Sequence, residues 1–287
     1  MINKFINRLR QHRYLKNTDP WDIANEKNVV VTFTGGLGAQ LLSAAIYFYL
    51  ESIGASVCAD LSYFKISEKK ADLGEGLSQW GWQLDGYGIK FDYFRCHNVQ
   101  DKNHRDAFLI NDGPLKLSLA ISALSRGCVN SRFPILEKSI EDLGLLNMLS
   151  KINQVPYLCL HIRRGDYLNV ASYLVPDEDF IRLTARFKNI FKRVVIVSDS
   201  QLSNNFLSEL KNNITEVIAL DGSRYSEFLC HVVMRKATVL VCSNSQYSLS
   251  AGVLNENLVI IPKKWFSGRS SNLQHVVDNF SKFQIFI

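Results

Sequence analysis

Apolar runs and helical patterns alternate in the first part of the chain. Residues 28–34, NVVVTFT, form a β-branched run that ends at Gly35 and Gly36, which is typical of a buried parallel strand followed by a tight turn. Residues 38–53 have a helical pattern, and residues 55–60 have the pattern of a second short strand. Strand, glycine turn, helix and strand in this order predict the opening of a Rossmann-like lobe.

A long stretch with no clear period follows, over residues 65–106. It is rich in Gly, Lys and Asp and carries the aromatic residues Trp80, Trp82, Tyr87 and Tyr93. Loops of this length are usually functional or disordered. Two interpretations stay open: the rings stack on sugars, or they pack a loop-rich edge of the lobe.

The second half of the chain repeats the alternation of strands and helices. A helical segment over 135–153 is expected to cross between two lobes. Strands are expected at 157–162, 193–197, 216–220, 238–242 and 258–261, with helices at 177–190, 202–212, 226–235 and 246–254. Strands that alternate with helices favour a parallel sheet.

The length of 287 residues fits two α/β lobes of roughly 130–150 residues each. We therefore expect a leader over residues 1–27, an N-terminal lobe over 28–150 and a C-terminal lobe over 151–287. The leader is polar and basic, and Phe5, Ile6 and Leu9 could form a short amphipathic face within it. It is interpreted either as a solvated helix or as a weak anchor for anionic lipid.

Composition narrows the class of protein. Hydrophobic residues make up 47% and charged residues 21% of the chain, as is usual for globular enzymes. The net charge of +6 suits a protein that handles anionic substrates or lies near anionic lipid. The chain has no nucleic-acid recognition motif, no C-x-x-C pair, no apolar signal region and no apolar run of about 18 residues. We expect a cytoplasmic protein that binds neither zinc nor nucleic acid, peripheral at most to the inner face of the membrane.

Three polar segments follow predicted strands and carry the candidate chemistry. His161-Ile-Arg-Arg-Gly-Asp-Tyr167 stands where a strand ends, which is where open α/β sheets bind ligands. Two adjacent arginines there are costly to fold without an anion, and their planar groups match phosphate oxygens. Ser198-Asp199-Ser200 either hydrogen-bonds a base or ribose or caps a helix. Residues 243–248, SNSQYS, form either a phosphate cradle or a capping loop.

The turn at residues 34–40, TGGLGAQ, is a fourth candidate. Its glycines permit positive φ and close approach of the backbone to a ligand, and the following helix would offer free N–H groups. The spacing matches neither G-x-G-x-x-G nor a P-loop, so a purely structural turn stays open as the alternative. No acidic pair stands out as a metal clamp, and arginine and helix ends are expected to stabilise a leaving diphosphate in place of Mg²⁺.

Taken together, these segments resemble the α-1,2-fucosyltransferase family, similar to glycosyltransferase family 11. The matching segments are GGLGAQ (35–40), HIRRGDY (161–167), SNSQYS (243–248) and IIPKKWF (260–266), in the family's order. HIRRGDY is a full match and the most specific of the four. The resemblance runs from about residue 29 to residue 266 and is thin between residues 65 and 150.

The resemblance implies a GT-B-like fold, with an N-terminal acceptor lobe, a C-terminal GDP-sugar lobe and the active site in the cleft between them. It implies an inverting, metal-independent transfer of L-fucose from GDP-β-L-fucose to a galactose-type hydroxyl in α-1,2 linkage. The acceptor would be a glycan or a lipid-linked oligosaccharide in O-antigen or surface polysaccharide synthesis. No cofactor is expected.

The resemblance also implies roles for single residues. Arg163 and Arg164 would hold the leaving diphosphate, and Arg163 would stabilise its charge. Apart from the resemblance, Asp166 is the nearest candidate for the general base, with a structural role as the alternative, and Asp177 and Glu178 are weaker candidates. The donor would be bound by the turns and the motif residues Gly36, Gly38, Gln40, His161, Arg164, Asp199, Ser243, Ser245, Gln246 and Tyr247.

Two departures from the family pattern keep alternatives open. Ala39 stands where the family usually has Asn, and Leu249-Ser250 stand where it usually has two tryptophans. The alternatives are a transferase of the same fold with another linkage or nucleotide sugar, and a non-catalytic module that binds GDP or a glycan.

Overall fold

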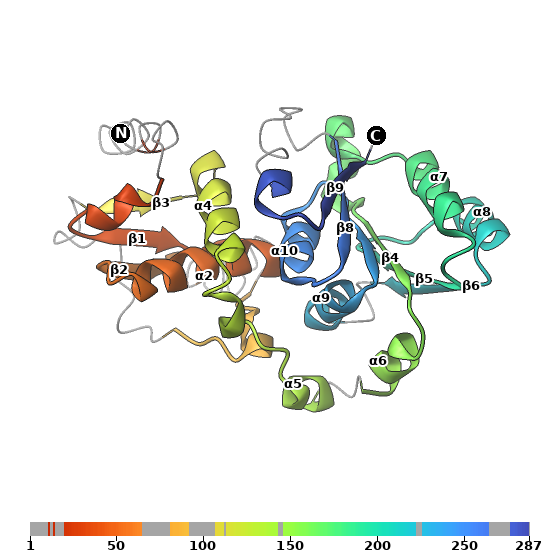
Figure 1. Cartoon of the computed structure of the whole chain (residues 1–287), viewed down its shortest axis with the longest axis horizontal. Helices are drawn as coiled ribbons and strands as arrows, with labels where there is room; N and C mark the ends of the chain where they lie inside the picture. The colour runs from red at the N-terminus through yellow and green to blue at the C-terminus, as the bar shows by residue number, and fades with distance from the viewer. Residues whose placement is uncertain are drawn as a thin grey trace, which may run out of the picture. The chain divides into compact units, whose positions relative to one another are not determined.

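The chain forms two compact units, Met1–Pro134 and Ile135–Ile287, and each contains a parallel sheet (Figure 1). The computed structural model describes Gln11, Tyr14 and residues 20–64, 81–91, 107–111, 113–142, 146–221, 226–263 and 276–286. The predicted α/β class with two parallel-sheet lobes is confirmed.

The first unit contains a sheet in the order β2-β1-β3, parallel throughout. Helix α2 connects β1 to β2 as predicted and packs against α4, whereas β3 and α4 were not expected from the sequence. The elements described are η1 (Pro20–Asn25), β1 (Val29–Thr32), α2 (Leu37–Ser52), β2 (Val57–Asp60), η2 (Leu84–Tyr87), β3 (Phe108–Ile110), α4 (Pro114–Ser125) and η4 (Asn130–Arg132).

The second unit contains a parallel sheet in the order β6-β5-β4-β7-β8-β9. Its strands are β4 (Leu158–Ile162), β5 (Arg193–Ser198), β6 (Glu216–Asp221), β7 (Val239–Val241), β8 (Leu258–Pro262) and β9 (Phe283–Phe286). The chain runs outward from β4 to β6 on one side and then returns to place β7, β8 and β9 on the other. This is the strand order of a doubly wound Rossmann fold.

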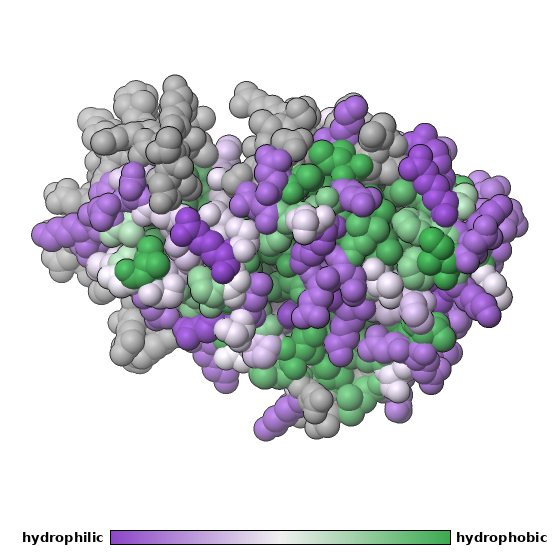
Figure 2. Space-filling model, in the orientation of Figure 1, coloured by the Kyte–Doolittle hydropathy of each residue, from purple (hydrophilic) through white to green (hydrophobic). Residues whose placement is uncertain are grey.

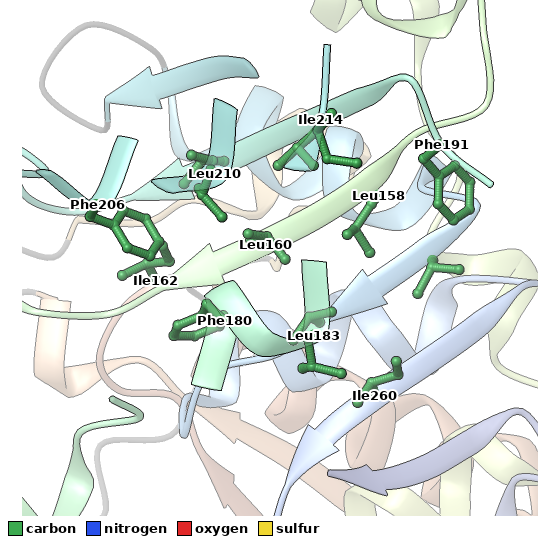
Figure 3. Packing of buried hydrophobic residues seen from close by; sticks show 14 of the residues in the cluster. Leu158, Leu160, Ile162, Phe180, Leu183, Phe191, Phe206, Leu210, Ile214 and Ile260 are labelled. Carbon is green, nitrogen blue, oxygen red and sulfur yellow. The ribbon is translucent and has the colours of Figure 1, made fainter. Parts of the chain in front are cut away.

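Helices cover both faces of the second sheet (Figure 1). The helices of this unit are α5 (Glu137–Asp142), α6 (Leu146–Asn153), η5 (Gly165–Asn169), η6 (Ala171–Tyr173), α7 (Asp177–Phe187), α8 (Asn204–Asn213), α9 (Glu227–Lys236) and α10 (Gln246–Leu254). Alternate residues of a strand point to opposite faces. Leu158, Leu160 and Ile162 of β4 therefore pack with Phe180 of α7 and Phe206 of α8 (Figure 3). Hydrophilic residues gather over the outer sides of these two helices (Figure 2), as expected for amphipathic helices.

The division between the units falls after Pro134, earlier than the boundary after residue 150 that the sequence predicts. Helix α6 belongs to the second unit because Leu149 and Ile152 are buried. Arg193 at the start of β5 also donates from Nη1 to the carbonyls of Lys151 and Ile152, at 2.7 and 2.8 Å. A short helical pattern does not reveal which lobe buries its apolar side.

The predicted leader is partly integrated into the first unit. Trp21 and Ile23 of η1 are buried, and Trp21 Nε1 donates to Ser122 Oγ at 2.9 Å. Residues 20–25 therefore contribute to the core, while Phe5, Ile6 and Leu9 lie outside the described residues. None of the described helices combines the length and the apolar character that crossing a bilayer requires.

Candidate functional site

Three predicted segments lie at the carboxyl edge of the second sheet. HIRRGDY spans the end of β4, Ser198-Asp199-Ser200 spans the end of β5, and residues 243–247 follow β7. These three strands are neighbours in the sheet, with β4 in the middle. The chain reverses its direction of winding between β4 and β7, and doubly wound sheets bind ligands at that point.

The two arginines of the motif form an ion-pair cluster with carboxylates, hereafter the arginine cluster: Arg163, Arg164, Asp166, Asp177 and Asp199. Arg163 contacts Asp166 Oδ1 through Nη2 at 2.7 Å and Asp199 Oδ2 through Nη1 at 3.0 Å. The backbone N–H of Arg164 donates to Asp199 Oδ1 at 2.8 Å, and its Nη2 pairs with Asp177 at the start of α7. Both guanidinium groups thus face carboxylates of the same unit.

This pairing corrects the sequence-based reasoning about the arginines. An external anion is not required to balance them, because Asp199 and Asp177 are brought in from β5 and α7. Asp199 holds Arg163 and the backbone of Arg164, so its first role is to position the motif. Within the described ranges, no group of three or more His, Cys, Asp and Glu is arranged to hold a metal ion.

The closeness of Asp199 to position 165 explains why a glycine follows the two arginines. A Cβ atom at this position would lie 2.5 Å from Asp199 Oδ2, and the residue has φ of +20°. Its N–H donates to Ser200 Oγ at 3.1 Å. A side chain at position 165 would therefore push Asp199 away from the arginines.

His161 is buried on the face of β4 opposite to the leucine core. Its Nδ1 shares a 2.7 Å hydrogen bond with Ser243 Oγ, and its ring lies 5.4 Å from the ring of Tyr247. Burial, with a smaller contribution from Arg163, lowers the pKa of His161 to about 3. The imidazole is therefore neutral near pH 7, and it links β4 to the segment after β7 through Ser243 and Tyr247.

The segment after β7 is a helix cap built from serines. Ser245 is the N-cap of α10 and accepts from the N–H of Tyr247 at 3.2 Å. Ser243 and Ser245 are buried, while Gln246 and Tyr247 are half-buried. Ser245 therefore caps α10, and the first N–H groups of α10 lie at the carboxyl edge of the sheet. The cap of α8 is Ser203, so the alternative of a helix cap does not apply to Ser198-Asp199-Ser200.

The glycine turn belongs to the first unit, where Gly36 is the N-cap of α2 and Gly38 is in its first turn. Gln40 is fully buried. Its Nε2 donates to the carbonyls of Gly35 and Gly81 at 2.8 and 2.9 Å, and its Oε1 accepts from Gln83 N at 2.9 Å. Its side-chain atoms therefore join the turn to residues 81–83 of the same unit, which favours the structural alternative for Gln40.

The described aromatic residues of the long irregular stretch pack internally. The Trp82 ring lies 5.5–5.8 Å from those of Phe33, Phe64 and Phe91, and Tyr87 is buried. Packing is therefore the better interpretation for these two residues. Trp80 and Tyr93 lie outside the described residues.

Three residues around the candidate site have contacts that the sequence did not indicate, and one of them, His231, was not assigned to the site at all. Ser200 accepts from Gly165 N, and Asp177, named only as a weak candidate base, pairs with Arg164. His231 of α9 is buried, hydrogen-bonds Ser250 Oγ at 3.0 Å and lies 5.4 Å from the Tyr247 ring. A histidine inside a helical apolar pattern was the only signal that could have indicated it.

Comparison with solved structures finds 17 similar chains, and two of these are structures of POFUT1. The structure of POFUT1 in complex with GDP-fucose aligns at 9% identity and a TM-score of 0.46, over 81% of this chain and 94% of that one. The apo form aligns at 10% identity and a TM-score of 0.45, over 84% and 97%. No protein-family model and no curated protein matches the sequence. The contacts of the arginine cluster are seen in this chain itself and do not depend on its similarity to POFUT1.

Proposed function

We propose that this protein is an inverting fucosyltransferase that moves L-fucose from GDP-β-L-fucose to a galactose-type hydroxyl in α-1,2 linkage. The observation that carries the proposal is the pair Arg163 and Arg164 at the switch point of a Rossmann-ordered sheet, where β4 pairs with β7, the strand that precedes α10. Planar guanidinium groups and helix N-termini both favour phosphate oxygens. The resemblance of HIRRGDY to the motif of the α-1,2-fucosyltransferase family favours GDP-fucose over other nucleotide sugars as the donor.

The donor diphosphate would lie between the arginines and the first turn of α10. The side chain of Arg163 is 21% exposed and that of Arg164 is 14% exposed, so both side chains are held by the fold and remain partly open to solvent. Ser243, Ser245, Gln246 and Tyr247 would border the phosphates, and Asp199 with Gly165 would keep the two arginines in place. We propose that neither a metal nor a cofactor takes part.

The reaction is a single displacement. The acceptor oxygen forms a bond to the anomeric carbon while the bond from that carbon to the β-phosphate oxygen breaks, and its electron pair leaves with GDP. Negative charge grows on the β-phosphate, where Arg163 stabilises it. Asp166, whose side chain is 70% exposed, accepts the proton of the acceptor hydroxyl.

The test is turnover of GDP-fucose by the purified protein with galactose-terminated acceptors in the presence of EDTA, followed by GDP release and product mass. Arg163→Ala is expected to lower kcat by ~10²–10³. The matched control is Arg182→Ala, which removes another arginine that pairs with an aspartate three residues away, at 2.7 Å from Asp179 on α7. Equal turnover of wild type and Arg163→Ala would contradict the proposal.

A second candidate is a module that binds GDP or a glycan without turnover. It is favoured by the glycine turn, because Ala39 has no polar side chain and Gln40 uses its own polar atoms within the first unit. GDP binding without consumption of GDP-fucose by any acceptor would support it. A transferase with another nucleotide sugar or linkage would instead be detected by competition between donors.

For the cellular role we propose synthesis of an O-antigen or surface polysaccharide on a lipid-linked oligosaccharide, in the cytoplasm at the inner face of the membrane. The basic residues near the N-terminus support this because they favour anionic lipid. Flotation with vesicles that contain anionic lipid tests it, and equal recovery with neutral vesicles would contradict it.

A further inference from the structure

We propose that Asp166 determines the specificity of the site by competing with the ligand phosphate for Arg163. The inference rests on the proposed function, because it concerns the same anion-binding arginines. Asp166 Oδ1 accepts a hydrogen bond from Arg163 Nη2 at 2.7 Å, so a phosphate oxygen that approaches this end of the guanidinium group meets a carboxylate of the same sign and competes with it for Arg163. A ligand gains from the site only when its charge attracts Arg163 more strongly than Asp166 does.

The balance of charge in the arginine cluster supports this competition. Two guanidinium groups face the three carboxylates of Asp166, Asp177 and Asp199. The arginine cluster thus has one more negative group than positive groups. A diphosphate brought next to this excess is repelled until one carboxylate withdraws.

Asp166 is the carboxylate that withdraws most readily. Its side chain is 70% exposed, whereas that of Asp199 is 23% exposed. Asp199 also accepts from Arg164 N, and its Oδ2 lies 2.5 Å from the position that a Cβ on Gly165 would take. Asp177 is in the first turn of α7, where the helix dipole favours a negative charge. Asp166 has a single ion-pair partner among the described residues, three positions away on the same loop.

The consequence is discrimination by phosphate charge. An uncharged nucleoside has no negative group that could replace the carboxylate of Asp166 at Arg163. A diphosphate carries more negative charge than one carboxylate, so it can replace this contact. Removing the charge of Asp166 therefore makes the site bind phosphates more tightly and leaves nucleoside binding unchanged. An increase in affinity is informative, because damage to the fold would lower it.

The experiment is calorimetric titration of wild type, Asp166→Asn and a control variant with guanosine, GDP and inorganic pyrophosphate. Exposed ion pairs of this kind are weak, so Asp166→Asn is expected to bind GDP and pyrophosphate roughly two- to fivefold more tightly, with guanosine affinity unchanged. The control, Glu51→Gln, removes the carboxylate that contacts Arg132 at 2.8 Å. It lies at the C-terminal end of α2, away from the glycine turn, and should change none of the three affinities.

The outcomes separate the inference from the function on which it rests. Unchanged or weaker binding of GDP and pyrophosphate by Asp166→Asn, with wild type binding GDP, overturns the inference and leaves the donor site standing. Equal gains in Glu51→Gln would also overturn it, because they would come from net charge alone. Absence of GDP binding by wild type overturns the proposed function, while tighter pyrophosphate binding by Asp166→Asn would still support the competition for Arg163.

Discussion

Replacing Gly165 by alanine perturbs the arginine cluster through one added methyl group. The new Cβ would lie 2.5 Å from Asp199 Oδ2, which is closer than a carbon and an oxygen approach without a bond. Asp199 must therefore move. Its movement breaks the 3.0 Å contact with Arg163 Nη1 and weakens the 2.8 Å hydrogen bond from Arg164 N.

The size of the effect follows from these two contacts. Hydrogen bonds to charged groups contribute about 1.5–3 kcal/mol each, and partial exposure of Asp199 reduces that value. We expect Gly165→Ala to lower the free energy of unfolding by about 2–3 kcal/mol and to reduce turnover of GDP-fucose. Gly127→Ala is the control, because Gly127 has φ of +73° and no atom within 4 Å of an added Cβ. It measures the strain of a positive φ without a collision.

The assay is urea unfolding of four proteins: wild type, Gly165→Ala, Asp199→Ala and the double variant. With Asp199 shortened to alanine, the added methyl meets no carboxylate, and we expect it to cost about 1 kcal/mol or less. The coupling energy between the two positions is then about 1–2 kcal/mol. Equal costs of Gly165→Ala in both backgrounds would refute the conclusion that Asp199 is what requires glycine at position 165.

Two further predictions concern stability. Gln40→Ala is expected to lower the free energy of unfolding by about 2–4 kcal/mol, because two backbone carbonyls and one N–H lose a buried partner; a loss below about 1 kcal/mol in urea unfolding would contradict this. His161 has a pKa of about 3 in the fold against 6.5 when unfolded, so its contribution to stability is complete above pH 6.5 and is lost as the pH falls towards 3. Protonation of this residue in the unfolded chain contributes up to about 1.4 kcal/mol per pH unit to the slope of the free energy of unfolding against pH. His161→Asn should remove this contribution from unfolding curves measured between pH 6.5 and 4.5. An unchanged slope in the variant would contradict the prediction.

The parts of the fold that the sequence predicts well are those with a strong local signal. The β-branched runs before Gly35 and around Val195 and the mostly apolar run before Arg163 predicted β1, β5 and β4 and placed the motifs at strand ends. Strand β9 was not predicted because FQIF is short and follows no recognisable turn. Helix α4 was missed although its apolar residues and Pro114 at its first position are typical of a helix start.

The candidate site shows the limit of local reasoning more sharply. HIRRGDY indicated an anion site because two adjacent arginines at a strand end are costly to fold without an anion. The sequence could not show that Asp199 would hold both of them, since that contact joins residues 35 positions apart through the pairing of β4 with β5. Gln40 was interpreted as a ligand-facing residue for the same reason, because its partners Gly81 and Gln83 come from a distant segment.

The position of β4 has a consequence for the motions of the candidate site. All five residues of β4 are buried, and the strand is hydrogen-bonded to β5 on one side and to β7 on the other. Amide protons in such a strand exchange with solvent only when much of the unit opens. The short helix η5 that follows has no buried residue, so its amides exchange through small local openings. Arg163 and Arg164 thus lie between a strand whose amide protons exchange slowly and a short helix whose amide protons exchange fast. The segment that carries Asp166 can therefore rearrange while β4 remains closed.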